Sequence, residues 1–151
     1  MTTCVICVGN ELRGDDAAGL EVLRLLDGTL PEDVRAIACE GEPVSLLSLW
    51  EDCEAAIVVD ATQSGVEPGT VRRLPVHDEP LPEELRRTST HLLGVAEAVE
   101  LARALGKLPA RTIVFGIEGG SWDMGAGLTP EVAEAADVVA ASIRRELGSR
   151  A

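Results

Sequence analysis

The fold is decided near the N-terminus by the stretch VICVGNELRGDDAAG, residues 5–19. Its first four residues are apolar and uninterrupted, which is typical of a short strand buried on both faces. Gly9 and Gly14 then break the pattern, because glycine tolerates left-handed backbone conformations. Two adjacent carboxylates, Asp15 and Asp16, follow at once, and an apolar helical pattern starts behind them. We therefore expect a strand, a tight loop and a helix whose N-terminus carries two acids.

The acid pair has a structural and a functional interpretation. Aspartate is a favoured N-cap residue and is stabilised near the positive end of the helix dipole, so one of the two acids is explained by the helix alone. The second acid is surplus to that role. We expect it to be available to face a ligand.

Composition limits the class of protein. The 151 residues suit one domain, 1–151, and the 46% of apolar residues predict a real hydrophobic core. Aromatic residues make up only 2%, which removes the stacking platforms that single-strand nucleic-acid binders use. The formal net charge of −13 repels phosphate backbones and anionic membranes, so we expect neither as a partner. Such a charge suits a basic partner or a metal cation. The apolar runs are too short for a signal peptide or a membrane span, so we expect neither.

The cysteines are expected to be buried structural thiols in a reducing cytoplasm; they are Cys4, Cys7, Cys39 and Cys53. Cys4 and Cys7 have the spacing of a redox or zinc pair. Both fall within the first strand, however, where positions three apart point to opposite faces. No second such pair completes a tetrahedral zinc set. We therefore expect Cys4 and Cys7 to be neither disulfide-bonded nor metal-bound.

Apolar runs alternate with helical patterns along the rest of the chain. The pattern predicts further strands at 34–39, 55–59, 71–74 and 112–117, and helices at 16–27, 44–50, 89–105 and 130–147. Strands and helices in alternation favour an α/β fold with a mostly parallel sheet and helices on both faces. The charged, proline-rich segment 75–90 is the least organised and predicts a mobile or substrate-contacting loop. His77, inside it, is expected to be solvent-exposed.

Three polar residues are candidates for one site. Right-handed crossovers bring the carboxyl ends of the strands and the N-termini of the following helices to one sheet edge, where ligands bind. Asp16 follows the first strand, Asp60 ends the run 55–59, and His91 opens a helix. Each has a simpler explanation as a cap or turn residue, although a carboxylate that ends an apolar run needs a partner. Two carboxylates and one neutral imidazole suit a divalent transition metal with open coordination positions.

Several motifs together resemble the hydrogenase maturation endopeptidases, the proteases that trim the C-terminus of the large subunit of [NiFe] hydrogenases. The motifs are GNELRGDDAAG at 9–19, IVVDA at 57–61, THLLG at 90–94, GIE at 116–118 and GLTP at 127–130. They occur in order across nearly the whole chain and fall at the expected ends of strands and helices.

The resemblance implies a three-layer fold, a twisted five-stranded, mostly parallel sheet between helices with one antiparallel edge strand. It implies a cytoplasmic, monomeric hydrolase of aspartyl type that removes the C-terminal extension of a nickel-loaded large-subunit precursor. The family recognises nickel already installed in the precursor, through two carboxylates and a histidine. By position these are Asp16, Asp60 and His91, expected to be both the metal-binding and the catalytic residues. Other divalent metals suit the same ligands.

Two other function classes fit parts of the sequence. A dinucleotide-binding module shares the strand–turn–helix layout, but only Gly9 and Gly14 appear where a G-x-G-x-x-G pattern is needed. Asp15 and Asp16 would also repel a pyrophosphate. A non-catalytic, chaperone-like protein that senses nickel in a client would use the same three ligands, so it stays an alternative.

Overall fold

The computed structural model describes residues 2–40, 42–82 and 90–149, and for residues 90–93 and 149 the backbone alone. The strands in this part of the chain are β1 (Thr3–Val8), β2 (Val34–Cys39), β3 (Ala55–Thr62), β4 (Val71–Pro75) and β5 (Arg111–Glu118). The helices are a short 3-10 helix η1 (Gly14–Ala17), α1 (Ala18–Leu26), α2 (Pro43–Trp50), α4 (Thr90–Ala104) and α5 (Pro130–Ser149). Among the described helices, none has both the length and the apolar character needed to cross a membrane.

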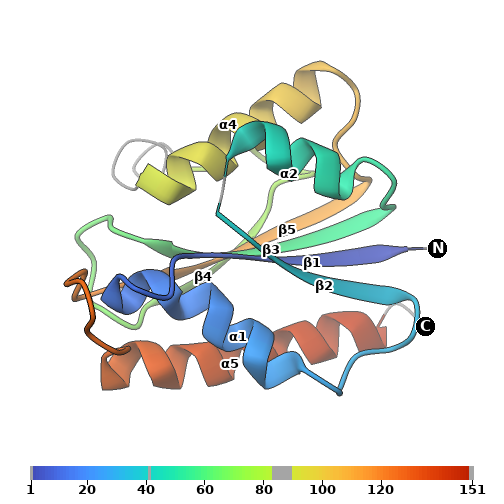
Figure 1. Cartoon of the computed structure of the whole chain (residues 1–151). Coiled ribbons are helices and arrows are strands. Elements are labelled where there is room, and N and C mark those ends of the chain that lie inside the picture. Colours follow the sequence, from blue (N-terminus) through green and yellow to red (C-terminus); the bar gives the residue numbers. More distant parts are fainter. Residues whose placement is uncertain (1, 41, 83–89, 150–151) are drawn as a thin grey trace.

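The strands form one five-stranded sheet in the order β2-β1-β3-β5-β4. Neighbouring strands are parallel except β4, which pairs antiparallel with β5 at one side of the sheet. Helices α2 and α4 cover one face, and α1 and α5 cover the other (Figure 1). The predicted α/β fold, mostly parallel with one antiparallel edge strand, is thus confirmed.

The parallel strands β1, β2, β3 and β5 all end at the same edge of the sheet, called the carboxyl edge below. Helix η1, the loop 63–70 and the loop 119–129 lie at this edge, on the left in Figure 1. Helix α4 also begins at this edge. Its last residue, Ala104, lies near the opposite end of the sheet, and only six residues separate it from Arg111, the first residue of β5. The fold therefore gathers four separate segments of sequence around one end of the sheet.

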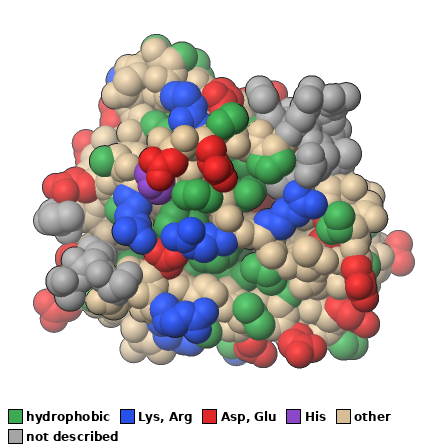
Figure 2. Space-filling view, turned by 180° about the vertical axis from the view of Figure 1, so that it is seen from behind, with side chains coloured by type: hydrophobic (Ala, Val, Ile, Leu, Met, Phe, Trp, Pro, Cys, Tyr) green, Lys and Arg blue, Asp and Glu red, His purple; other side chains and the backbone are tan. Residues whose placement is uncertain are grey.

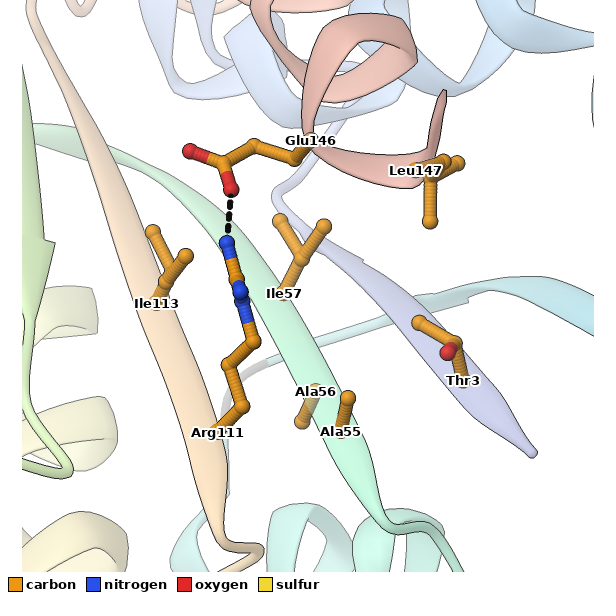
Figure 3. Close-up of a pocket in the computed structure, with 8 residues that line it drawn as sticks. All are labelled: Thr3, Ala55, Ala56, Ile57, Arg111, Ile113, Glu146 and Leu147. Carbon is orange, nitrogen blue, oxygen red and sulfur yellow. Dashed lines mark hydrogen bonds and ion pairs between the residues drawn. The ribbon is translucent and has the colours of Figure 1, made fainter. Parts of the chain in front are cut away.

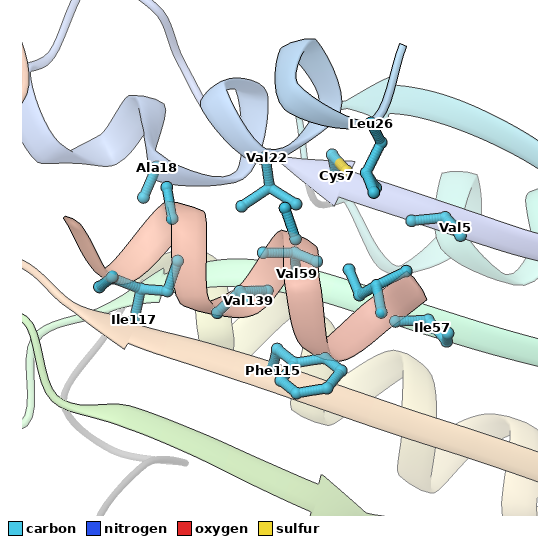
Figure 4. Close-up of a cluster of buried hydrophobic side chains, with 14 of the residues drawn as sticks. Val5, Cys7, Ala18, Val22, Leu26, Ile57, Val59, Phe115, Ile117 and Val139 are labelled. Carbon is cyan, nitrogen blue, oxygen red and sulfur yellow. The ribbon is translucent and has the colours of Figure 1, made fainter. Parts of the chain in front are cut away.

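Strand alternation divides the core into two layers. Cys4, Ile6 and Val8 pack toward α2 and α4, whereas Val5 and Cys7 pack toward α1 and α5. Figure 4 shows the second layer, where strand side chains meet apolar side chains of both helices. This alternation confirms that positions three apart in β1 face opposite ways.

Three element boundaries differ from the predicted ones. The helix expected at 16–27 begins as η1 and continues as α1, because Gly14 takes a φ of 55°. Strand β3 continues past Asp60 to Thr62, since its last residues pair with β5. Helix α5 runs through Gly148, which was expected to end it. The segment 83–89, within the predicted mobile loop, lies outside the described residues.

The expectation of four thiols is wrong for Cys4 and Cys53, which form a disulfide. Cys4 pairs in register with Ala56, so Cys53, two residues before β3, is brought beside β1, and the Cα atoms of the two cysteines lie 6.3 Å apart. Cys7 and Cys39 remain thiols. Burial, with a smaller contribution from Cys39, raises the pKa of the Cys7 thiol to about 12.

The expectation that His77 is solvent-exposed is also wrong. Its side chain is 22% exposed, and its Nδ1 accepts the backbone N–H of Thr112 at 3.0 Å. The cause is Val76, which is buried and keeps the chain against β5 after β4 has ended. His77 is therefore held by the sheet and is separate from the carboxyl edge.

The surface charge is unevenly distributed. Although the net charge is −13, basic side chains gather on the face shown in Figure 2. Two strands and a helix are joined by one carboxylate: Glu146 of α5 accepts hydrogen bonds from Arg73 of β4, at 2.5 Å, and from Arg111 of β5. This ion-pair cluster ties the antiparallel edge of the sheet to α5.

Candidate active site

The loop after β1 folds back on itself and fixes the position of Asp16. A Cβ atom at Gly9 would lie 2.4 Å from the backbone oxygen of Asp16, which is closer than real atoms approach. The Asn10 N–H donates to that same oxygen at 3.3 Å, and the Asn10 side chain accepts the N–H of Leu12 at 2.9 Å. Glycine at position 9 thus lets η1 pack directly against the end of β1.

Asp15 is a structural residue. Its side chain is wholly buried, and its Oδ2 accepts the backbone N–H groups of Gly120 at 2.8 Å and Ser121 at 3.0 Å. Its Oδ1 accepts the N–H of Thr129 at 2.8 Å, and the Thr129 hydroxyl donates to the same carboxylate. Asp15 therefore fastens the loop 119–129 to η1, and of the two adjacent acids it is the one with the structural role.

Asp16 and Asp60 are two further buried acids of the carboxyl edge. Neither side chain is exposed to solvent, and η1, which carries Asp16, contacts β3, which carries Asp60. Asp60 Oδ1 accepts the N–H of Ala61 at 2.8 Å. Asp60 lies two residues beyond Val58, and therefore on the face of the sheet that α4 covers. Two buried carboxylates at one place favour a cation between them.

His91 lies in the first turn of α4, at the same edge as the two acids. Its side chain lies outside the described residues. Among the side chains that the structure describes, no group of three His, Cys, Asp or Glu residues is placed to hold a metal ion. The three-ligand set therefore stays a prediction that depends on His91.

Glu118 is a further buried acid of this edge and lies one residue beyond the strand predicted at 112–117. It is 3% exposed and ends β5. Its carboxylate accepts the hydroxyl groups of Thr62 at 2.8 Å and Ser64 at 2.7 Å, and the N–H groups of Ser64 and Gly65. Glu118 thus closes the loop after β3. The signal that was available is an acid at the end of an apolar run, the same signal that pointed to Asp60.

A small cavity lies at the opposite end of the sheet. It is lined by the first residues of three strands, Thr3, Ala55 and Arg111, and by Glu146 of α5 (Figure 3). Apolar side chains fill most of its wall, and the ion pair between Arg111 and Glu146 crosses it. It is remote from Asp16 and Asp60 and is not part of the candidate site.

Fold and buried acids together define an α/β protein with a candidate ligand site at the carboxyl edge of its sheet, where ligands of such folds bind. The sequence profile of the hydrogenase maturation protease family (HycI) matches residues 22–146. The chain therefore belongs to the hydrogenase maturation protease family, whose members are peptidases.

Individual relatives agree with this family. The hydrogenase expression/formation protein HupD of Rhodobacter capsulatus is 31% identical over 146 residues, which cover 95% of this chain and 70% of that protein. The hydrogenase 2 maturation protease of Escherichia coli K12 is 30% identical over 136 residues, which cover 87% of this chain and 82% of that protein. Among solved structures, the hydrogenase maturating endopeptidase HybD from E. coli superposes with a TM-score of 0.77, at 27% identity, over 97% of this chain and 94% of that one.

Proposed function

We propose that this protein is an endopeptidase that removes the C-terminal extension of a nickel-loaded [NiFe] hydrogenase large-subunit precursor. In this proposal Asp16, Asp60 and His91 recognise the nickel ion that the precursor carries. The nickel is part of the substrate, and the chain itself supplies an incomplete set of ligands.

The observation that carries the proposal is the pair of buried acids at the carboxyl edge of a maturation-protease fold. Asp15 and Glu118, the other buried acids there, receive several hydrogen bonds from loop backbone and hydroxyl groups, which explains them structurally. Asp16 and Asp60 belong to η1 and β3, which contact each other. The Asp60 side chain lies on the face of the sheet that α4 covers. The two acids are therefore well placed to act with a residue from the first turn of that helix.

The chemistry of these side chains suits recognition of a metal in a partner. Two carboxylates and an imidazole leave coordination positions for the ligands that the precursor keeps and for water. Nickel bound in this way would act as a Lewis acid on a peptide carbonyl or lower the pKa of a bound water. Asp16 and Asp60 would hold the ion, and so the nearby peptide, at a fixed place on the sheet edge.

The proposal extends to a monomeric enzyme in the cytoplasm, where the precursor is expected. Sedimentation of the purified protein tests the monomeric state, and fractionation of cells tests the location.

The test compares nickel-loaded and nickel-free precursor as substrates of the purified protein, with mass spectrometry of the released C-terminal peptide. We expect cleavage of the loaded precursor only. Equal cleavage of the nickel-free precursor would contradict recognition through nickel. Tight binding of the loaded precursor without cleavage would instead identify a non-catalytic nickel-sensing factor. His91→Ala is expected to abolish cleavage while the circular dichroism melting curve is kept.

A further inference from the structure

Three apolar side chains stand in solvent around the carboxyl edge. Leu12 is 57% exposed, Met124 is 68% exposed and Val66 is 36% exposed. They belong to the loops that follow β1, β5 and β3 respectively. We call these three residues the apolar rim.

The loops that carry the apolar rim are joined to one another. The backbone oxygen of Leu12 accepts the N–H of Gly125, the neighbour of Met124, at 2.8 Å. A Cβ atom at Gly120 would lie 2.9 Å from the Pro68 ring, so the loop that carries Val66 packs against the loop 119–129. The three residues of the rim are therefore carried by one connected group of loops.

The loop 63–70, which carries Val66, is held by the hydrogen bonds of Glu118, and the loop 119–129, which carries Met124, is held by those of Asp15. The Asp15 backbone N–H donates to the oxygen of Ser121 at 2.8 Å, and its carboxylate holds the other end of that loop at Thr129. A surface that is already ordered loses little conformational freedom when a partner binds. Single exposed apolar residues are normal in proteins, but three on ordered, touching loops beside a buried acid pair indicate a contact surface.

We propose that the apolar rim is the docking surface for the apolar segment of the precursor that flanks its nickel centre. This inference rests on the proposed function and names how the substrate is held beside the site. Charge complementarity selects the partner: the buried acids Asp16 and Asp60 favour a cation, so the face that meets the rim carries the metal. The net charge of −13 disfavours an acidic segment there, and the thioether of Met124 adapts to an apolar one.

The test uses a double variant of the rim, Leu12→Ser with Met124→Ser. Its control is Leu105→Ser with Val138→Ser, because these residues are 56% and 50% exposed and lie away from the rim, Leu105 just after the end of α4 and Val138 on α5. We measure KM and kcat on nickel-loaded precursor, and the Kd for the same precursor by calorimetry. All four positions are solvent-exposed, so both variants should keep the wild-type melting temperature.

We expect the rim variant to raise KM and Kd by about tenfold or more, as for residues at the centre of an interface, with kcat little changed. The control variant should bind like the wild type. Unchanged KM and Kd in the rim variant, or an equal loss in the control, would overturn the docking surface and leave the proposed function intact. Absence of cleavage by every protein, wild type included, would defeat the proposed function, while the Kd values would still decide the role of the rim.

Discussion

The carboxylate of Asp15 accepts the backbone N–H of Thr129 at 2.8 Å across 114 positions of sequence. The Thr129 hydroxyl donates to the same carboxylate. One buried acid thus links the start of α1 to the start of α5. Asp16, its neighbour, is the acid that we assign to the candidate site.

Replacing Asp15 is predicted to destabilise the fold. In Asp15→Ala the N–H groups of Gly120, Ser121 and Thr129 lose their acceptor in a partly buried place. We expect the free energy of unfolding to fall by roughly 3 kcal/mol, measured by urea denaturation. Asp137→Ala, at an exposed position of α5, serves as the control and should change stability by less than about 0.5 kcal/mol. If Asp15→Ala unfolded at the same urea concentration as the wild type, the loop 119–129 would have to be held by other contacts.

Adding a methyl group at Gly9 is predicted to displace Asp16. The new Cβ would meet the Asp16 backbone oxygen at 2.4 Å, so η1 must move away from β1. We expect Gly9→Ala to lower stability by about 1–3 kcal/mol and to weaken the binding of nickel-loaded precursor. Gly127→Ala, where a Cβ meets nothing within 4 Å, is the matched control. Equal behaviour of the two variants would mean that this close approach does not position Asp16.

Thiol counts are predicted to distinguish the four cysteines. Without reductant, the native protein should react rapidly at Cys39 alone, because Cys7 is buried and its pKa is raised to about 12. Unfolding without reductant should expose Cys7 as well, and unfolding with reductant should add Cys4 and Cys53. Four reactive thiols in the unfolded, unreduced protein would show that the Cys4–Cys53 disulfide is absent.

Glu146 is predicted to stabilise the protein in a pH-dependent way. Burial raises the pKa of its carboxyl group, but the hydrogen bonds from Arg73 and Arg111 outweigh this and hold the pKa below its ordinary value of 4.5. A lowered pKa gives stability that is present above the ordinary value and is lost as the pH falls through the lowered one. Glu146→Gln should therefore cost up to about 1 kcal/mol at pH 7, less in strong salt, and little in acid. Thermal melts of both proteins from pH 7 down to pH 3 measure the difference, and a constant difference over that range would refute the ion pair.

The sequence was sufficient for the sheet and for the edge at which the candidate site lies. Asp60 shows why: an acid at the end of an apolar strand marks the carboxyl edge by local pattern alone. The division of roles between Asp15 and Asp16 was not predictable, because the partners of Asp15 lie more than a hundred positions away. The Cys4–Cys53 disulfide was missed for the same reason, since it depends on the register of β1 against β3.

The central claim is that Asp16 and Asp60 recognise the nickel of the precursor. The most direct measurement is the rate at which Asp16→Asn and Asp60→Asn cleave nickel-loaded precursor, beside melting curves of the same samples. Asparagine keeps the shape of the side chain and removes the charge that a metal ion requires. We predict that each variant stays folded and loses at least about a hundredfold in rate. Wild-type rates in either folded variant would contradict the claim and remove that residue from the site.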